Sequence, residues 1–279
     1  MIWQIRGKTL DLGAKTLVMG ILNITPDSFS DAGQFFDEDE AVMRGKQMLA
    51  DGADILDIGG ESSRPGSAPV SEEEELRRVI PVIDRLADEA GAIISVDTTK
   101  SRVAIEAMDA GASIINDISA MRFDAGMAGV AARLGAGVVL MHMQGTPADM
   151  QKDPVYGDLM GEVVSFLSER GDLARKSGVL NEAIVYDPGI GFGKTIRHNL
   201  ELINRIGDLK TALGRPMLSG PSRKSFIGAV LDVPVEERIE GTAAAVAMSI
   251  VRGASIIRVH DVREMARIAK MVDAILGAD

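Results

Sequence analysis

Polar residues able to do chemistry recur in this chain directly after short apolar segments. Asp97 follows AIISV, Asp187 follows AIVY, and Arg258 and His260 follow SII. A strand buried on both faces has no structural need for a charged group at its end. The pattern occurs eight times, and the residues at the ends are Asn23, Asp57 with Gly59, Asp97, Asn116 with Asp117, His142, Asp187, Ser219, and Arg258 with His260. The carboxyl ends of parallel strands open on one side of a sheet, so these eight groups of polar residues predict one composite active site.

The acidic and amide side chains of this group are suited to a flat heterocycle. A carboxylate accepts two parallel N–H bonds, and an asparagine offers both a donor and an acceptor. Asp97, Asn116 and Asp187 together are therefore able to bind a ring with an amidine-like edge. The alternative for each residue is a buried capping or ion-pairing role without contact to a ligand.

A cationic group is predicted beside the last two strands. Lys224 lies in SGPSRKSF, where Ser222 is placed to cap a short helix, and Arg258 and His260 alternate on one face of RVHDV. Anion sites in barrels are often built from the loops after these two strands. We therefore predict a phosphate pocket of Lys224, Arg258 and His260, with neutralisation by nearby acids such as Asp261 as the alternative.

The segments between the apolar runs have the periodicity of helices. Ser71 and Glu74 form a capping pattern at the start of one of them. The predicted helices cover residues 37–51, 71–90, 99–110, 124–134, 156–177, 197–213, 234–252 and 261–276. Such strand–helix repeats fit either a closed (β/α)8 barrel or an open doubly wound sheet.

Two features favour the closed (β/α)8 TIM barrel. Polar residues follow all eight apolar runs, whereas an open sheet concentrates its site at one switch point. The pair Gly-Ala precedes three strands, at Gly52, Gly111 and Gly253, which indicates a repeated left-handed cap at the helix ends. No change in composition marks a second domain. We predict one domain over residues 1–279, with an N-terminal hairpin in 1–13 that plugs a barrel of 17–277.

The overall composition limits the class of function. The formal charge of −11 argues against nonspecific binding to nucleic acid or to an anionic membrane. The absence of cysteine excludes a disulfide, a thiolate nucleophile and a Cys-bound metal. No signal-like or membrane-length apolar segment is present, so we expect a cytoplasmic protein. The three histidines lack metal-type spacing, whereas a Mg²⁺ held mainly by substrate phosphates is compatible with the sequence.

Two long loops and a glycine-rich turn border the expected site. Residues 23–33 and 57–71 are rich in Pro, Ser, Asp and Gly, and long loops at this end of a barrel are typical of mobile lids. The turn GIGFG in 189–193 lacks the full spacing of a dinucleotide fingerprint. We interpret it as a turn that presents Phe192 to a ring.

Seven segments together closely resemble the dihydropteroate synthase family of pterin-binding enzymes. They are NITPDSFSDAG, DIGGESSRPG, SVDTTK, NDIS, DPGIGFGK, SRKS and RVHD, and they span almost the whole chain. The family has a (β/α)8 barrel and joins 4-aminobenzoate to a pterin carrying a methyl diphosphate, with release of diphosphate. The resemblance implies this transferase reaction of folate biosynthesis, a Mg²⁺ cofactor and a homodimer formed through the late outer helices.

The resemblance also implies roles for individual residues. It implies that the pterin is held by Asp97, Asn116, Asp187 and Lys224, that Asn23 contacts Mg²⁺, and that the diphosphate is bound by Ser63, Arg258 and His260. Around the aminobenzoate it places Pro26, Asp27, Phe29, Ser63, Arg64 and Pro65, with Ser225 near the carboxylate of that substrate. Phe192 completes the substrate-binding set. The catalytic candidates are Asp97, Asp187, Lys224 and Asp27.

The chain departs from the family pattern at two positions. Ala32 replaces a glycine, which affects the flexibility of the first loop, and Ser63 replaces a threonine but keeps the hydroxyl. Two other functions remain open. A pterin-dependent methyltransferase of the same barrel would have no use for SRKS and RVH, and a non-catalytic paralogue has little reason to keep Phe29, Arg64 and Pro65 together.

Overall fold

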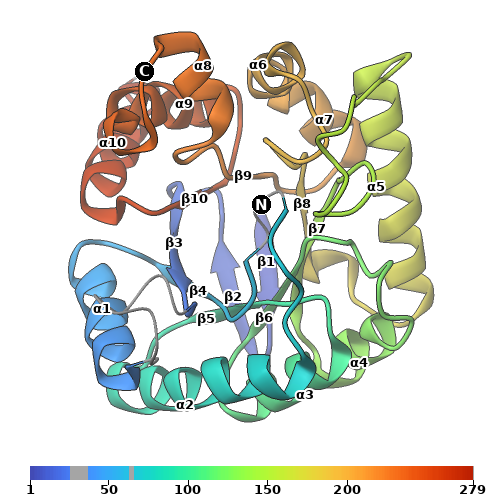
Figure 1. Cartoon of the computed structure of the whole chain (residues 1–279), viewed down its shortest axis with the longest axis vertical. Coiled ribbons are helices and arrows are strands. Elements are labelled where there is room, and N and C mark those ends of the chain that lie inside the picture. Colours follow the sequence, from blue (N-terminus) through green and yellow to red (C-terminus); the bar gives the residue numbers. More distant parts are fainter. Residues whose placement is uncertain (26–36, 63–65, 279) are drawn as a thin grey trace.

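The structure, a computed structural model, describes residues 1–25, 37–62 and 66–278. Its centre is a sheet of eight parallel strands that follow one another around a ring (Figure 1). The strands are β3 (Leu17–Asn23), β4 (Ile55–Gly59), β5 (Ile94–Asp97), β6 (Ile114–Asp117), β7 (Gly137–Met141), β8 (Ile184–Asp187), β9 (Leu218–Ser219) and β10 (Ile256–Val259). A bridge between Tyr186 and Met217 brings β8 beside β9. The predicted barrel is therefore confirmed.

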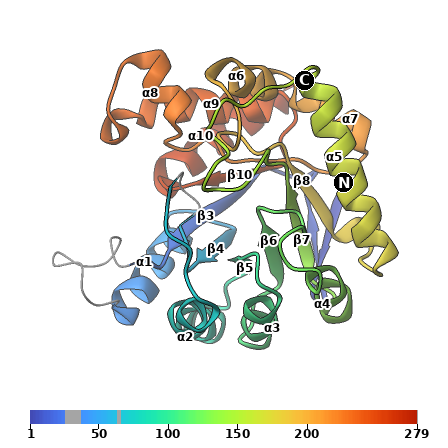
Figure 2. The same ribbon diagram turned by 45° about the vertical axis from the view of Figure 1, so that its right-hand side comes forward.

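Helices surround the sheet and connect consecutive strands (Figures 1 and 2). They are α1 (Glu38–Ala50), α2 (Glu72–Ala90), α3 (Ser101–Asp109), α4 (Met127–Leu134), α5 (Leu159–Lys176), α6 (Ile196–Asn204), α7 (Ile206–Leu213), α8 (Ser225–Leu231), α9 (Ile239–Val251) and α10 (Val262–Leu276). The single helix predicted over 197–213 is instead two helices, α6 and α7, because the backbone of Arg205 leaves the helical region at φ −117° and ψ 20°. Among the described residues, no helix has the length and apolar character that crossing a bilayer requires.

The helix ends follow the local signals in the sequence. The Ser71 side chain accepts from the N–H of Glu74 and caps α2, as predicted. The three Gly-Ala turns place Gly52, Gly111 and Gly253 at φ of 108°, 112° and 103°. These are values that only glycine adopts readily, so the repeated exit from the helices is confirmed.

An antiparallel hairpin covers the end of the barrel where the strands begin. It consists of β1 (Ile2–Ile5) and β2 (Lys8–Asp11). The Trp3 side chain is fully buried, and its Nε1 donates to the carbonyl oxygen of Ala183 at 2.8 Å. Trp3 and Ile5 share one apolar cluster with the first residues of several strands, namely Leu17, Ile55, Ile114, Leu218 and Ile256. The hairpin is therefore the predicted plug.

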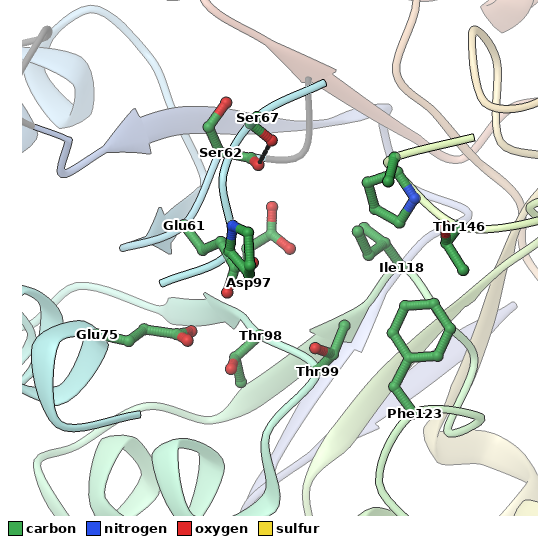
Figure 3. Close-up of a pocket in the computed structure, with 13 residues that line it drawn as sticks. Glu61, Ser62, Ser67, Glu75, Asp97, Thr98, Thr99, Ile118, Phe123 and Thr146 are labelled. Carbon is green, nitrogen blue, oxygen red and sulfur yellow. Dashed lines mark hydrogen bonds between the residues drawn. The ribbon is translucent and has the colours of Figure 1, made fainter. Parts of the chain in front are cut away.

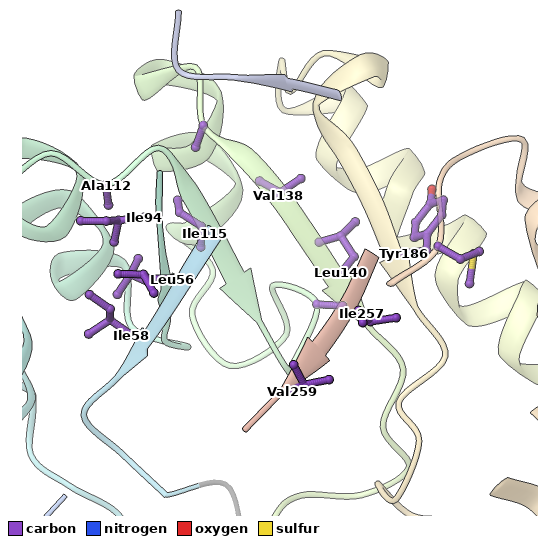
Figure 4. Close-up of a cluster of buried hydrophobic side chains, with 14 of the residues drawn as sticks. Leu56, Ile58, Ile94, Ala112, Ile115, Val138, Leu140, Tyr186, Ile257 and Val259 are labelled. Carbon is purple, nitrogen blue, oxygen red and sulfur yellow. The ribbon is translucent and has the colours of Figure 1, made fainter. Parts of the chain in front are cut away.

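The inside of the barrel changes from apolar to polar along the strands. Successive residues of a barrel strand alternate between the interior and the helix layer. In β4, Leu56 and Ile58 pack in the cluster beneath the helices (Figure 4), whereas Ile55 lies in the interior cluster. By this alternation, the interior residues toward the carboxyl ends of the strands are Asp57, Ser95, Asp97, Asn116, Asp187 and Arg258. The apolar half holds the barrel together, and the polar half forms the floor of its mouth.

Candidate active site

Four strands bring predicted site residues to one end of the barrel. Asp97 ends β5, Asp187 ends β8, and Asn116 and Arg258 are each the third residue of their strands, β6 and β10. Asn116 and Asp187 are buried, and the side chains of Asp97 and Arg258 are 11% and 17% exposed. The common location of these residues is therefore as the sequence predicts.

A buried carboxylate connects two of these residues beneath the mouth. Oδ2 of Asp57 accepts from Nδ2 of Asn116 at 3.0 Å and from Nε of Arg258 at 2.5 Å. Nη2 of Arg258 donates to Oδ2 of Asp97 at 2.7 Å. Asp261, the acid weighed as a partner for Arg258, pairs with Arg223 instead. Arg258 is thus neutralised by acids of β4 and β5 rather than by its neighbour in the sequence.

The carboxyl group of Asp97 holds its proton more tightly than usual. Burial raises the pKa of Asp97 to about 7. The positive charge of Arg258 opposes this rise, and the negative charges of Asp57, Glu75 and Asp117 add to it. Because both charge states of Asp97 are accessible near neutral pH, a ligand that donates N–H bonds or carries positive charge will favour the ionised form.

A cleft of roughly 270 Å³ opens beside Asp97. In Figure 3, Asp97, Glu75 and Thr98 lie on one side of this cleft, and Ile118 and Thr146 lie on the other. The cleft combines an acidic wall with an apolar wall, as a flat ring with a polar edge requires.

Asp187 and Lys224 provide opposite charges at the other side of the mouth. Oδ1 of Asp187 accepts from the N–H of Gly189 at 2.7 Å. Burial raises the pKa of Asp187, whereas the Gly189 bond and the charge of Lys224 lower it. Burial, with the charge of Arg258, lowers the pKa of Lys224 to about 8. Nζ of Lys224 lies 4.1 Å from the centre of the Phe192 ring, so two predicted substrate-binding residues are in contact.

His260 is held in place by two contacts with Ser222. The backbone N–H of His260 donates to Oγ of Ser222 at 3.2 Å, and Nδ1 of His260 lies 3.0 Å from the same oxygen. The hydroxyl of Ser222 thus bonds both the backbone and the ring of His260, with the direction of the bond to Nδ1 set by the tautomer of the ring. Burial and the charges of Arg258 and Arg223 lower the pKa of His260 to about 3. At neutral pH His260 is consequently uncharged, so the positive charge of the predicted phosphate pocket comes from Lys224 and Arg258.

The loop before α8 also differs from the prediction. Ser222 does not cap this helix, since its hydroxyl is engaged by His260 and the N-cap position is Lys224. Ser225 is the exposed first residue of α8. Asn23, at the end of β3, lines a separate cleft of roughly 630 Å³ together with His260. The predicted metal ligand Asn23 and one predicted diphosphate residue, His260, thus border one space.

Several predicted lid residues lie outside the described residues. They are Pro26, Asp27, Phe29, Ala32, Ser63, Arg64 and Pro65. In the described part of the second loop, the N–H of Gly66 lies 3.4 Å from the carbonyl oxygen of Pro147. Oγ of Ser67 also donates to the carbonyl oxygen of Ser62. This loop therefore contacts the loop that follows β7.

A buried lysine, Lys194, fixes the glycine-rich turn. The sequence predicts no role for it. Nζ of Lys194 donates to the carbonyl oxygen of Phe192 at 2.9 Å and lies 3.0 Å from Nδ1 of His142. Burial lowers the pKa of His142 to about 2 and the pKa of Lys194 to about 7. Lys194 ends the segment DPGIGFGK, but nothing in that segment indicates that the lysine turns inward.

Replacing Lys194 by methionine is expected to change how stability depends on pH. The pKa of Lys194 is about 7 in the folded chain, compared with about 10.4 in an unfolded chain. Between these values the unfolded chain binds the extra proton, so this group makes the wild type more stable as pH rises. Lys194→Met should lose that slope, which is at most about 1.4 kcal/mol per pH unit. Urea unfolding at several pH values checks this, and parallel curves for both proteins would refute it.

Gly189→Ala is expected to destabilise the turn. Gly189 has φ +69°, and a Cβ at this position would lie 1.9 Å from the carbonyl oxygen of His142. Relieving such an overlap requires a backbone shift that costs roughly 1–3 kcal/mol, in addition to the strain of the left-handed backbone. Gly7→Ala is a matched control, because Gly7 has the same φ and no atom within 4 Å of the added Cβ. Equal shifts in the urea midpoints of both variants would show that the contact with His142 is unimportant.

Comparisons with known proteins identify the family. A model described as pterin binding enzyme matches residues 19–260. The dihydropteroate synthase of Synechocystis sp. is 51% identical over 271 residues, which are 96% of this chain and 93% of that relative. The chain belongs to the dihydropteroate synthase family. The predicted family and the transferase activity are thereby confirmed.

Solved structures of dihydropteroate synthases share the complete fold. The Yersinia pestis enzyme, in a sulfonamide drug complex, has a TM-score of 0.94 and 44% identity, with 100% of both chains covered. The Xanthomonas albilineans enzyme, in complex with 7,8-dihydropteroate, has a TM-score of 0.90 and 40% identity, again with 100% of both chains covered. These matches favour the synthase over the methyltransferase alternative.

Proposed function

We propose that the chain joins 4-aminobenzoate to (7,8-dihydropterin-6-yl)methyl diphosphate and releases diphosphate. A carbon–nitrogen bond forms to the methylene carbon of the pterin, and the carbon–oxygen bond to diphosphate breaks. One observation carries the proposal, namely the buried carboxylates Asp97 and Asp187 and the cations Lys224 and Arg258 at one barrel mouth. The product of this reaction, 7,8-dihydropteroate, is the compound bound by the Xanthomonas relative.

The acidic side of the mouth is proposed to hold the pterin. Ionised Asp97 and Asp187 accept N–H bonds from the polar edges of the ring, and Asn116 adds one amide to the set. Lys224, against the ring of Phe192, donates to a ring oxygen or nitrogen. The apolar wall formed by residues such as Ile118 packs against the face of the bicycle.

The charges of the same residues are proposed to accelerate bond cleavage. As the carbon–oxygen bond lengthens, positive charge grows on the pterin methylene and negative charge grows on the diphosphate. Asp97 and Asp187 lie on the pterin side and stabilise the positive charge. Groups fixed before the reaction need no reorganisation, which makes such stabilisation a large part of catalysis, on the order of 3 kcal/mol per group.

The diphosphate is proposed to lie toward the cleft lined by Asn23 and His260. In the tautomer with its proton on Nε2, the neutral His260 ring would donate to an oxygen of the leaving group, and Arg258 adds positive charge. Asn23 would hold a Mg²⁺ ion through one amide oxygen, a fit for an ion that takes its other ligands from phosphate and water. Bound there, the ion would supply further neutralisation of the diphosphate charge.

The nucleophile is proposed to be the neutral arylamine of 4-aminobenzoate. An arylamine is uncharged near neutral pH and attacks without a strong base, so its proton leaves after the new bond has formed. Ser225 is exposed directly beside Lys224, where its hydroxyl is available to the substrate carboxylate. The roles of Asp27, Phe29, Ser63, Arg64 and Pro65 around this substrate remain predictions.

A homodimer is also part of the proposal. Four exposed side chains form an outer apolar patch. They are Leu200 on α6 (45% exposed), Val230 and Leu231 on α8 (56% and 47%) and Met248 on α9 (41%). A contiguous patch of large apolar side chains on a late outer face is suited to a second copy of this chain. Sedimentation velocity tests it, and a monomer at every concentration would refute it. The proposal retains the single pterin-binding domain over residues 1–279, with its barrel in 17–277, and the cytoplasmic location predicted from the sequence.

The deciding experiment is diphosphate release that depends on 4-aminobenzoate. The purified chain is incubated with the pterin methyl diphosphate and Mg²⁺, with and without the arylamine. The proposal expects rapid release only when both substrates are present, with 7,8-dihydropteroate formed in equal amount. Release at the same rate without the arylamine would indicate a hydrolase, and no release with both substrates would refute the proposal.

A further inference from the structure

Asp57 is a fully buried carboxylate to which neither the motifs nor the proposed reaction assigns a role. It lies on the interior face of β4, opposite Ser95 and thus two residues below the level of Asp97, and its side chain is 0% exposed. Its Oδ1 has no hydrogen-bond partner among the described residues. An unpaired carboxylate oxygen in a protein interior costs stability. The ion pair with Arg258 accounts for one oxygen of Asp57 but leaves Oδ1 without a partner among the described residues.

The contact with Asn116 fixes the orientation of an amide. A carboxylate has acceptors only, so the group of Asn116 that faces Asp57 must be the amide nitrogen, at 3.0 Å from Oδ2. One N–H is used in this bond. The amide oxygen and the second N–H remain for a ligand, in an orientation that a neutral or apolar residue at position 57 would not enforce.

The contact with Arg258 fixes the direction of a guanidinium group. Nε of Arg258 donates to the same Oδ2 of Asp57, and Nη2 donates to Asp97. Two acids from different strands therefore hold the planar group at two of its nitrogens. This leaves little freedom for rotation about the end of the side chain.

We propose that Asp57 is a positioning residue that orients Asn116 and Arg258 for the pterin substrate from below the floor of the mouth. Asp57 does not touch the substrate and acts only through these two neighbours. The inference rests on the proposed function, because it assumes that Asn116 and Arg258 meet the pterin methyl diphosphate.

Two substitutions of different severity test this role. Asp57→Asn retains one acceptor oxygen for Asn116 and Arg258, whereas Asp57→Ala removes the acceptor entirely. We expect the KM for the pterin methyl diphosphate to rise roughly 10-fold in Asp57→Asn and more in Asp57→Ala. An effect of this size is typical when a hydrogen bond to a charged group is lost. The KM for 4-aminobenzoate should stay within about twofold of the wild type, since Asp57 does not orient that substrate.

The pH dependence of pterin binding is a second readout, which a purely structural role would not move. The charged groups that face Asp97 are Arg258 from β10, Asp57 from β4, Glu75 from α2, Asp117 from β6, and Lys224 from the loop before α8. Removing the negative charge of Asp57 favours the ionised form of Asp97. The acid midpoint of pterin affinity should therefore move to lower pH in Asp57→Asn.

Ser95→Ala is the matched control. Ser95 pairs with Asp57 in the β4–β5 register, is fully buried, and has an Oγ without a partner among the described residues. This substitution alters the same layer of the barrel without a change of charge or of the Asn116 and Arg258 contacts. Pterin KM and the acid midpoint should both stay at wild-type values.

Calorimetric titration with the pterin methyl diphosphate separates the outcomes. Weaker pterin binding in Asp57→Asn, with wild-type values in Ser95→Ala, supports the positioning role. Equal losses in Asp57→Asn and Ser95→Ala, or equal losses for both substrates, would overturn it. If Asp57→Ala does not fold, the pterin affinity of Asp57→Asn alone decides whether Asp57 has the positioning role. Failure of the wild type to bind the pterin would instead count against the proposed function.

Discussion

Asp97→Asn is expected to lower kcat on the order of 100-fold, because it removes the negative charge that we propose stabilises the pterin methylene. The dissociation constant of the pterin should change less than about 10-fold, since asparagine retains the size and one acceptor oxygen. Steady-state kinetics together with equilibrium binding of the pterin methyl diphosphate separates the two effects. Comparable losses in kcat and affinity would argue against charge stabilisation in the transition state.

The same variant should abolish the loss of pterin affinity at acid pH, which is the acid limb of the pH profile. The pKa of Asp97 is about 7, so the wild type loses the ionised acceptor as pH falls below neutral. Pterin affinity should weaken over that range in the wild type and remain flat in Asp97→Asn. Asp54→Asn is a control, because Asp54 contacts Lys15 and Val18 at the amino-terminal end of the barrel. This control should keep wild-type turnover and the wild-type acid limb.

Arg258→Met is expected to lower the free energy of unfolding by about 3–5 kcal/mol, the typical cost of leaving a buried carboxylate without its cation. Asp57 is fully buried and Asp97 is 11% exposed, and both would lose their ion-pair partner. The sequence alone favours loss of diphosphate binding as the main effect. The structure adds a large stability effect, because the acids that hold Arg258 lie in the barrel core.

The penalty in Arg258→Met should depend on pH with a defined sign. Without the cation, the folded-state pKa of Asp97 rises further above its unfolded value. A raised carboxyl pKa contributes stability that is present at acid pH and lost as pH rises through the folded value. Urea unfolding should therefore show a larger deficit at about pH 8 than at about pH 5. A deficit that is independent of pH would contradict this account.

A surface arginine provides the comparison. Arg205 also contacts two acids, Glu201 at 3.0 Å and Asp208 at 2.9 Å, but its side chain is 43% exposed. Arg205→Met should cost less than about 1 kcal/mol, because water screens exposed ion pairs. A cost equal to that of Arg258→Met would mean that burial does not set the magnitude.

Much of the fold is predictable because it follows from local patterns. The apolar runs and their polar ends indicate strands β3 to β10, and the Gly-Ala turns mark three helix ends. The helix over 197–213 was mispredicted as continuous, since its periodicity persists through Arg205 where the backbone leaves the helix. Apolar spacing reports which face is buried but not a local change in backbone angle.

The candidate site is predictable as a set of residues but not as a set of contacts. Asp97, Asn116, Asp187 and Arg258 all come to one end of the barrel, because each lies near the carboxyl end of a parallel strand. His260 belongs to the predicted phosphate pocket, but only the folded chain shows that burial beside two arginines keeps its ring neutral. Lys194 was given no role, since only the folded chain shows that its amine is buried against His142.

The amino-acid sequence by itself determined the element types, the barrel, the family and the residues at its mouth, because these depend on short-range periodicity and on motifs. Only the tertiary structure decided which charges neutralise one another. Arg258 bonds to Asp57 and Asp97, which precede it by 201 and 161 residues, whereas Asp261, three residues further along the chain, pairs with Arg223. Ion pairing and pKa depend on distance and burial, and both are set when the ring of strands closes.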